Sequence, residues 1–123
     1  MNIFRFDSDV GKEIEQFGSV KVIISKVVHL EAEAMINCVY LRPNGKIGYH
    51  QAATRQLFLL VEGQGWVRSE SAEKHAVREG QAVFWEKDEW HESGTETGMT
   101  AVIIEGVSID PAKFMPPLQE NEP

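Results

Sequence analysis

Apolar residues occur along most of this chain in short runs, and turn-forming residues separate the runs. The runs expected to form strands are residues 20–30, 34–42, 56–62, 66–69, 75–77, 81–85 and 100–107. Most of them are rich in Val, Ile, Phe, Trp or Tyr, which strands favour. Pro, Asn and Gly place turns at Asn44-Gly45, Gly63-Gln64 and Gly80. This spacing of strands and turns predicts an all-β sandwich or barrel.

Two of the expected strands are apolar without interruption, at residues 57–61 and 101–104. Such runs indicate that a strand is buried on both faces. A small barrel buries only one face of each strand in its interior, so the other face needs a second layer or a partner subunit. The pattern therefore predicts a homodimer.

The two ends of the chain differ from this pattern. Residues 10–17 would place Ile14 and Phe17 on one side of a short N-terminal helix. Residues 111–123 contain four of the five prolines and end in polar residues. We therefore expect a C-terminal arm that lies on the surface and is frayed at its end.

Length, charge and cysteine content limit the classes of function. The chain has 123 residues, enough for a single domain spanning 1–123. It carries 12 basic and 19 acidic residues, and the net charge of −7 disfavours nucleic acid and anionic membranes as partners. No apolar run approaches the roughly 18 residues of a membrane span. The one cysteine, Cys38, lies in an apolar stretch, so we expect a buried thiol and a cytoplasmic location.

Five residues in the middle of the chain carry a resemblance to a known family. Gly45, His50 and Gly63 follow one another at nearly the spacing of the first cupin motif, and Gly80 and His91 match the second. Four residues separate Gly45 from His50, where the family has five. The resemblance spans about residues 41–107. It implies a cupin-type jelly-roll barrel, which is a double-stranded β-helix of two antiparallel sheets, here with the N-terminal helix and the C-terminal arm added.

The same resemblance implies a metal site, and the chain departs from it at two positions. In cupins, two histidines and a glutamate of the first motif join the histidine of the second around a divalent metal. His50 and His91 keep two of these positions, whereas Ala52 and Gln56 stand at the other two. Glutamine keeps an oxygen but loses the charge of a carboxylate, and alanine supplies no ligand. Two alternatives follow for His50, Gln56 and His91: a weakly bound divalent transition metal, or neutral groups hydrogen-bonded in a pocket.

Strand geometry supports the same positions. Residues of equal parity share one face of a continuous strand, and His50, Ala52 and Gln56 have equal parity. Phe58 follows Gln56 on that face, and tryptophans offer flat apolar walls, although each could equally fill the core or an interface. The predicted ligand-binding residues are His50, Gln56, Phe58, Trp66, Trp85, Trp90 and His91.

Three functions remain open from the sequence. The first is a small-molecule binding protein with a cupin-like barrel and a degenerate metal site. The second is a metal-dependent cupin enzyme of the oxygenase or isomerase type, with His50 and His91 as metal ligands. The third is an interaction module that associates through an apolar strand face. Because a fold does not determine a function, the side chains at the site must decide among them.

Overall fold

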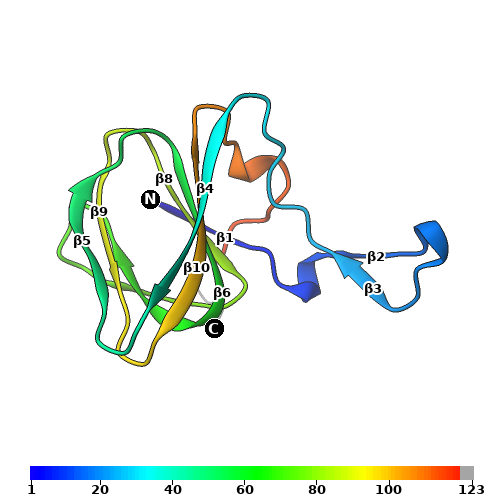
Figure 1. Ribbon diagram of the computed structural model, residues 1–123, viewed down its shortest axis with the longest axis horizontal. Coiled ribbons are helices and arrows are strands. Elements are labelled where there is room, and N and C mark those ends of the chain that lie inside the picture. The colour runs from blue at the N-terminus through cyan, green and yellow to red at the C-terminus, as the bar shows by residue number, and fades with distance from the viewer. Residues whose placement is uncertain (120–123) are drawn as a thin grey trace.

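Antiparallel strands make up nearly all of the regular secondary structure in the computed structural model, which describes residues 1–119 (Figure 1). The strands are β1 (Asn2–Arg5), β2 (Lys12–Ile14), β3 (Val22–Ile24), β4 (Ala34–Leu41), β5 (Lys46–Gln51), β6 (Gln56–Arg68), β7 (His75–Arg78), β8 (Gln81–Trp85), β9 (Trp90–Gly94) and β10 (Met99–Gly106). The short 3-10 turns are η1 (Ser8–Val10), η2 (Gln16–Gly18) and η3 (Pro111–Lys113). The prediction of an all-β fold is confirmed.

The long strand β6 belongs to both layers of the barrel. Its first half lies between β8 and β10 in the order β1-β8-β6-β10-β4, and its second half pairs with β7 and β9, which in turn pairs with β5. The two layers face each other in Figure 1. The strand changes layer at a bulge before Gly63, which has a φ of +88°. A Cβ at Gly63 would overlap the carbonyl oxygen of Gly98, so only glycine fits this bend.

Two apolar clusters lie on opposite faces of the β1-β8-β6-β10-β4 layer. The interior cluster fills the barrel and consists of Leu41, Phe58, Leu60, Val67, Val77, Val83, Trp85, Met99, Ala101 and Ile103. The outer cluster consists of Phe4, Leu57, Leu59, Ala82, Phe84, Ile104, Ile109 and Met115. Successive residues of β6 alternate between the two clusters, as the two-residue period of a strand requires.

The outer cluster explains the uninterrupted apolar runs at 57–61 and 101–104. Their outward side chains are covered by this chain's own Val27, Val28 and Leu30, together with Ile109 and Met115. The second layer that these runs require is therefore supplied within one chain. This removes the reason that the sequence offered for a homodimer, although it does not test the homodimer itself.

The predicted helix at residues 10–17 is wrong. Residues 12–14 form β2, which pairs with β3 through Lys12↔Ile24 and Ile14↔Val22, and Phe17 is almost fully exposed. The segment is too short and too poorly patterned to hold a helix, and pairing with the next strand in a hairpin prevails over helical spacing. The strand predicted at 20–30 is correspondingly reduced to β3, because the residues after it pack on the outer cluster without pairing.

Other elements differ in detail from the prediction. The turns at Asn44-Gly45 and Gly80 are confirmed, but Gly63-Gln64 lies within β6 as part of its bulge. The strands β1, β5 and β9 were not predicted. Their sequences are short or polar, so their pairing with β8 and with each other is a property of the assembled barrel.

The C-terminal arm lies along β1. The backbone N–H of Arg5 donates to the Pro116 carbonyl at 2.9 Å, and that of Leu118 donates to the Ile3 carbonyl at 2.8 Å. The predicted frayed end, residues 120–123, lies outside the described residues. Within residues 1–119, no helix is both long enough and apolar enough to cross a membrane.

Candidate functional site

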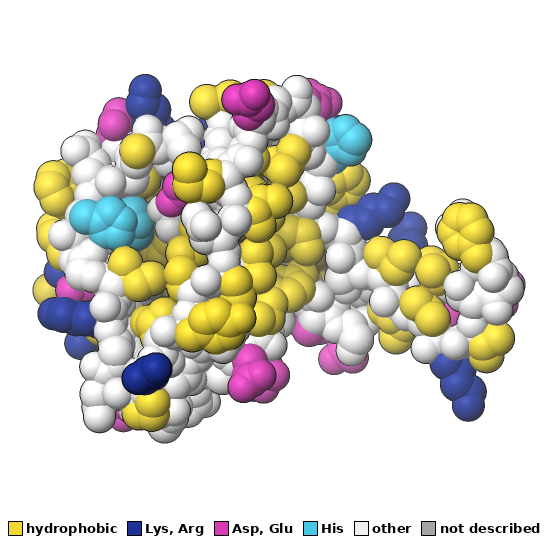
Figure 2. Space-filling model, in the orientation of Figure 1, with side chains coloured by type: hydrophobic (Ala, Val, Ile, Leu, Met, Phe, Trp, Pro, Cys, Tyr) yellow, Lys and Arg dark blue, Asp and Glu magenta, His cyan; other side chains and the backbone are white. Residues whose placement is uncertain are grey.

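Two histidines from neighbouring strands meet on the β5–β9 pair, where His91 is buried and His50 is exposed. His50 of β5 is the register partner of His91 of β9. Their ring centroids are 4.4 Å apart, and the ring planes are inclined by 55°. Histidine side chains are visible on the β5–β9 side of the molecule in Figure 2. The motif spacing therefore identified a pair that the fold brings together from positions 41 residues apart.

Both rings are held in the same tautomer by backbone carbonyls. Nδ1 of His50 lies 2.6 Å from the Gly48 carbonyl oxygen, and Nδ1 of His91 lies 3.1 Å from that of Glu89. A carbonyl only accepts hydrogen bonds, so we assign the proton of each neutral ring to Nδ1. Each Nε2 then carries a free lone pair. This is the arrangement of metal-ligating histidines, whose second nitrogen is fixed by a backbone or carboxylate acceptor.

Aromatic side chains of the interior cluster form one wall beside the pair. The ring of Trp85 stacks on His91 with centroids 4.3 Å apart and planes inclined by 26°, and Phe58 meets Trp85 edge-on at 6.1 Å. His91 is 2% exposed and Trp85 is fully buried. Neither Nε2 of His91 nor Nε1 of Trp85 has a hydrogen-bond partner in the described protein. One buried acceptor and one buried donor are thus unused, which is costly unless another group engages them.

Burial also changes the acidity of the site. It is the main cause that lowers the pKa of His91 below its usual value of 6.5, and the neighbouring charge of protonated His50 lowers it further. The Glu89 carbonyl opposes the shift by accepting from Nδ1. His91 therefore keeps its Nε2 lone pair to a more acidic pH than an exposed histidine would.

This shift predicts a loss of stability in mild acid. Because the folded-state pKa lies below the unfolded value, the unfolded chain binds the proton first as the pH falls through about 6.5. The contribution of neutral His91 is complete above that pH and decreases below it. We expect the free energy of unfolding in urea to fall more steeply from about pH 7.5 to pH 5 in the wild type than in His91→Phe, which keeps a buried ring. Equal slopes would contradict it.

The two altered motif positions are both buried. Ala52 lies just after β5, and its backbone bonds to Glu89 and Asp88 hold the end of β5 against the segment before β9. Gln56 opens β6, opposite Trp85, and is also buried. It has the same parity as Phe58 and Leu60 of the interior cluster. Within residues 1–119, no Asp, Glu, Cys or further His completes a group of three around the histidine pair.

The three predicted tryptophan walls do not lie together. Only Trp85 is in the interior cluster, whereas Trp66 and Trp90 lie on the outer face of their strands. Trp66 covers Gly94 across the strands, where a Cβ would overlap its ring, and Lys74 Nζ lies 4.1 Å from its centroid. The prediction that Trp66 and Trp90 line the same pocket as His91 is therefore not supported by their placement.

Trp90 belongs instead to a surface stack that the sequence did not reveal. Its ring stacks on Tyr49 with centroids 5.3 Å apart, and Arg68 Cζ lies over the Tyr49 ring, 4.2 Å from its centroid. Arg68 also donates to Glu92 at 2.8 Å, and this hydrogen bond is the main cause that lowers the pKa of Glu92. These residues come from three strands. Their side-chain parity would have suggested a common face only after the strand order was known.

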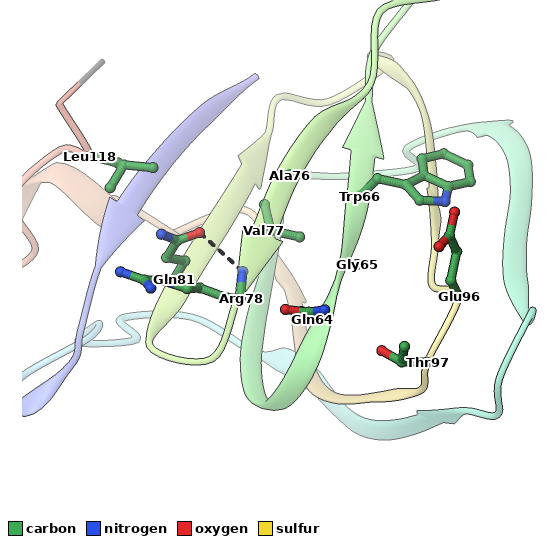
Figure 3. Close-up of a pocket in the computed structure, with 10 residues that line it drawn as sticks. All are labelled: Gln64, Gly65, Trp66, Ala76, Val77, Arg78, Gln81, Glu96, Thr97 and Leu118. Atoms are coloured by element: carbon green, nitrogen blue, oxygen red, sulfur yellow. Dashed lines mark hydrogen bonds between the residues drawn. The ribbon is translucent and has the colours of Figure 1, made fainter. Parts of the chain in front are cut away.

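A cavity of about 430 Å³ lies apart from the histidine pair. Trp66, Glu96 and Thr97 lie toward one end of it, and Gln81 and Leu118 toward the other (Figure 3). Its lining contains none of the other predicted site residues. Gln81 already accepts a hydrogen bond from the Arg78 backbone at 3.1 Å. Trp66 thus borders a different hollow from the one that the motifs predict.

This chain is similar to known proteins in structure, and no similarity in sequence was found by the family and curated-protein comparisons. No protein-family model matches the chain, and no curated protein matches it. A cupin superfamily protein from Desulfitobacterium hafniense aligns with a TM-score of 0.58 at 9% identity, over 71% of this chain and 79% of that protein. An RmlC-like cupin from Shewanella frigidimarina aligns with a TM-score of 0.55 at 17% identity, over 72% and 70%.

One similar structure is described in terms of an activity. It is a predicted oxalate decarboxylase from Thermotoga maritima, with a TM-score of 0.52 at 15% identity, over 57% of this chain and 63% of that protein. At such identities the similarity concerns the path of the backbone. The chemistry must be inferred from the side chains that this chain carries.

Proposed function

We propose that this protein, which has the cupin fold, binds a small molecule beside the His50–His91 pair, where a degenerate metal site remains. The observation that carries the proposal is the geometry of the pair: two rings 4.4 Å apart, each with Nδ1 bonded to a carbonyl. That arrangement leaves two Nε2 lone pairs, one of them buried and unpartnered. His91 is buried and His50 is exposed, so the pair joins the barrel interior to solvent.

The donor set fits a divalent transition metal held weakly. Imidazole nitrogen suits zinc, nickel, copper and iron, and His50 and His91 would be the ligands. Gln56 has the remaining oxygen at the motif positions but brings no charge, and Ala52 brings no donor. When bound, such a metal would act as a Lewis acid toward an oxygen of the ligand.

The residues around the pair would orient the small molecule. Trp85 and Phe58 form a rigid apolar wall because both are buried in the interior cluster. The Trp85 indole N–H is a free donor, so it would favour a ligand with an acceptor atom on that side. A site of this kind, mostly apolar with a few placed polar groups, is typical of small-molecule binding.

The alternative is a metal-dependent enzyme. It would use the same two histidines, and one structurally similar protein is described as a predicted oxalate decarboxylase. However, the positions at which cupins place a second histidine and a glutamate hold Ala52 and Gln56 here. With half of the donor set replaced, we favour binding over catalysis.

Metal titration of the isolated protein tests the proposal. Calorimetry with zinc or nickel should show one weakly bound ion, which a chelator removes readily. His50→Ala and His91→Ala should each abolish it, because one imidazole alone holds a metal poorly. His75→Ala is the matched control, since His75 is an exposed histidine on β7. Binding that survives both site variants, or a metal that resists the chelator, would refute the degenerate site.

Native mass spectrometry then addresses the small molecule. We expect a bound mass on the protein purified from its host, and we expect it to be lost in Trp85→Phe, which keeps the ring stack but removes the N–H donor. A protein that carries no such mass would favour the interaction module over the binding protein.

A further inference from the structure

A hairpin projects from the barrel with few contacts to it. This arm, residues 12–24, contains β2, η2 and β3, and it extends away from both layers in Figure 1. Within residues 1–119, β2 and β3 pair only with each other. At its base, the Ser25 hydroxyl donates to the Asp7 carbonyl at 2.8 Å. An isolated two-stranded hairpin is at best marginally stable in water, so the arm needs a surface to pack on.

The arm presents apolar side chains to solvent. Phe17 at its tip is 98% exposed, Val20 is 75% exposed, and Ile23 is 51% exposed. Val22 and Ile24 are also exposed, and Figure 2 shows hydrophobic side chains gathered over this hairpin. Single exposed apolar residues are ordinary, but a contiguous group on a projecting element marks an interaction site.

A second uncovered apolar surface lies on β4. Ile36, Cys38 and Tyr40 share its outward face, and we call them the β4 patch. Ile36 is 58% exposed and Tyr40 is 75% exposed. The free thiol of Cys38 is exposed too, contrary to the buried position expected from the sequence. The reason is that β4 is the last strand of its layer, which only the strand order reveals.

The edge strand itself lacks the usual protection against pairing. In the described part of the chain, β4 pairs with β10 on one side and with no strand on the other, and none of its eight residues is charged or a proline. Protein edges are normally guarded by lysine, proline, a bulge or a covering segment. An uncharged strand of this length at an open edge is therefore suited to contact another chain.

The β4 patch continues a surface that the chain covers elsewhere. The outward face of the same layer is covered by Val27, Val28 and Leu30 and by the C-terminal segment. That cover reaches Ala34 at the start of β4 and does not extend to Ile36 or Tyr40. The apolar layer is thus incomplete in one chain, at the strand where its edge is open.

We propose that a second copy of this chain completes the layer: the arm of each subunit packs across the β4 patch of the other. A two-fold dimer requires each copy to carry both halves of the contact, and one chain here carries both. Each chain exposes five apolar residues on the arm, and it exposes Ile36, Cys38 and Tyr40 on the β4 patch. Together these residues offer on the order of 800 Å² of surface per chain, or about 1,600 Å² in a dimer, which is the size of a standard stable interface. This inference is independent of the proposed function.

Mass measurements in solution test the dimer. Light scattering at micromolar concentration should give about twice the 13.9 kDa of one chain. Phe17→Ser combined with Val20→Ser, and separately Tyr40→Lys, should each halve that mass. All three positions are largely exposed, so these variants should fold, and circular dichroism checks that they do. Ala72→Lys, in the exposed connection before β7, is the charge-matched control and should remain dimeric.

The thiol of Cys38 reports on the location of the contact. In the dimer, its alkylation by a maleimide should be at least about tenfold slower than in the Phe17→Ser/Val20→Ser variant, because only the dissociated fraction reacts. Three outcomes would overturn the proposal: a monomeric wild type, a dimer unaffected by the arm and Tyr40 variants, or a dimer in which Cys38 reacts at the monomer's rate. A monomer with a protected thiol would mean that the arm folds onto its own β4, and a monomer with a reactive thiol would leave the patch to a different protein.

Discussion

Trp85→Ala should lower the free energy of unfolding by about 3–5 kcal/mol, the usual cost of removing a large aromatic side chain from a core. Trp85 is fully buried, stacks on His91 and meets Phe58 edge-on. Its loss would leave a cavity at the centre of the interior cluster. Since domains of this size are stable by only about 5–15 kcal/mol, this is a large share of the total. Urea denaturation monitored by far-UV circular dichroism measures the change.

Two further variants separate packing from simple loss of a tryptophan. Trp66→Ala removes an indole from the outer face, where it is only half-buried, and should cost no more than about half as much. Trp85→Phe keeps most of the ring packing and removes the unpartnered N–H, so it should cost less than Trp85→Ala. If Trp85→Ala proved no more destabilising than Trp66→Ala, the assignment of Trp85 to the barrel interior would be wrong.

Restoring the two altered motif positions should raise the metal affinity by at least about 100-fold. Outer-shell partners alone change metal affinity by about 10–100-fold, and Ala52→His with Gln56→Glu adds an imidazole and a carboxylate to two histidines already in place. Ala52 and Gln56 are both buried; Ala52 follows His50 by two residues, and Gln56 is the register partner of Trp85, which stacks on His91. Zinc or nickel calorimetry on the wild type and the double variant measures the gain.

The single variant Gln56→Glu tests the same idea if the double variant does not fold. It changes charge with almost no change of shape, so it tests whether position 56 reaches the metal without placing a large ring at Ala52. We expect about a tenfold gain in affinity, from one added negative charge near the metal. The matched control is Gln51→Glu, on a neighbouring exposed position of β5, which should leave the affinity unchanged. If neither restored variant bound metal more tightly than the wild type, these side chains would not converge with the histidines.

Much of the candidate site could be predicted from the sequence because it depends on spacing along the chain. The distances among His50, Gln56 and Gly63, and from Gly80 to His91, match a known pattern of turns and strands, and the fold brings the two histidines together. The tautomers also follow from local structure, since each Nδ1 bonds a carbonyl two residues earlier in the chain. Features that depend on such short spacing can be predicted from the sequence.

Placement of the tryptophans could not be predicted in the same way. Trp66 and Trp85 lie in strands of similar composition, yet one faces the surface and the other the interior. The bulge before Gly63 shifts the register of β6 against β10, so counting along β6 does not preserve the face. Which side of a strand is inside depends on strand order, and strand order is a property of the whole sheet.

The sequence by itself determined the strand-rich architecture, the turns at Asn44-Gly45 and Gly80, and the positions of the two histidines. These follow from side-chain period, backbone conformational limits and short spacing, all of which act within a few residues. The tertiary structure decided that residues 12–24 form an arm, that β4 is an open edge with Cys38 exposed, and that Trp85 alone stacks on His91. The exposed edge of β4 and the place of Trp85 depend on pairing between segments far apart in the chain, and only the complete barrel determines which side chains become buried. The arm is a local hairpin, but its exposure depends on where the rest of the chain packs.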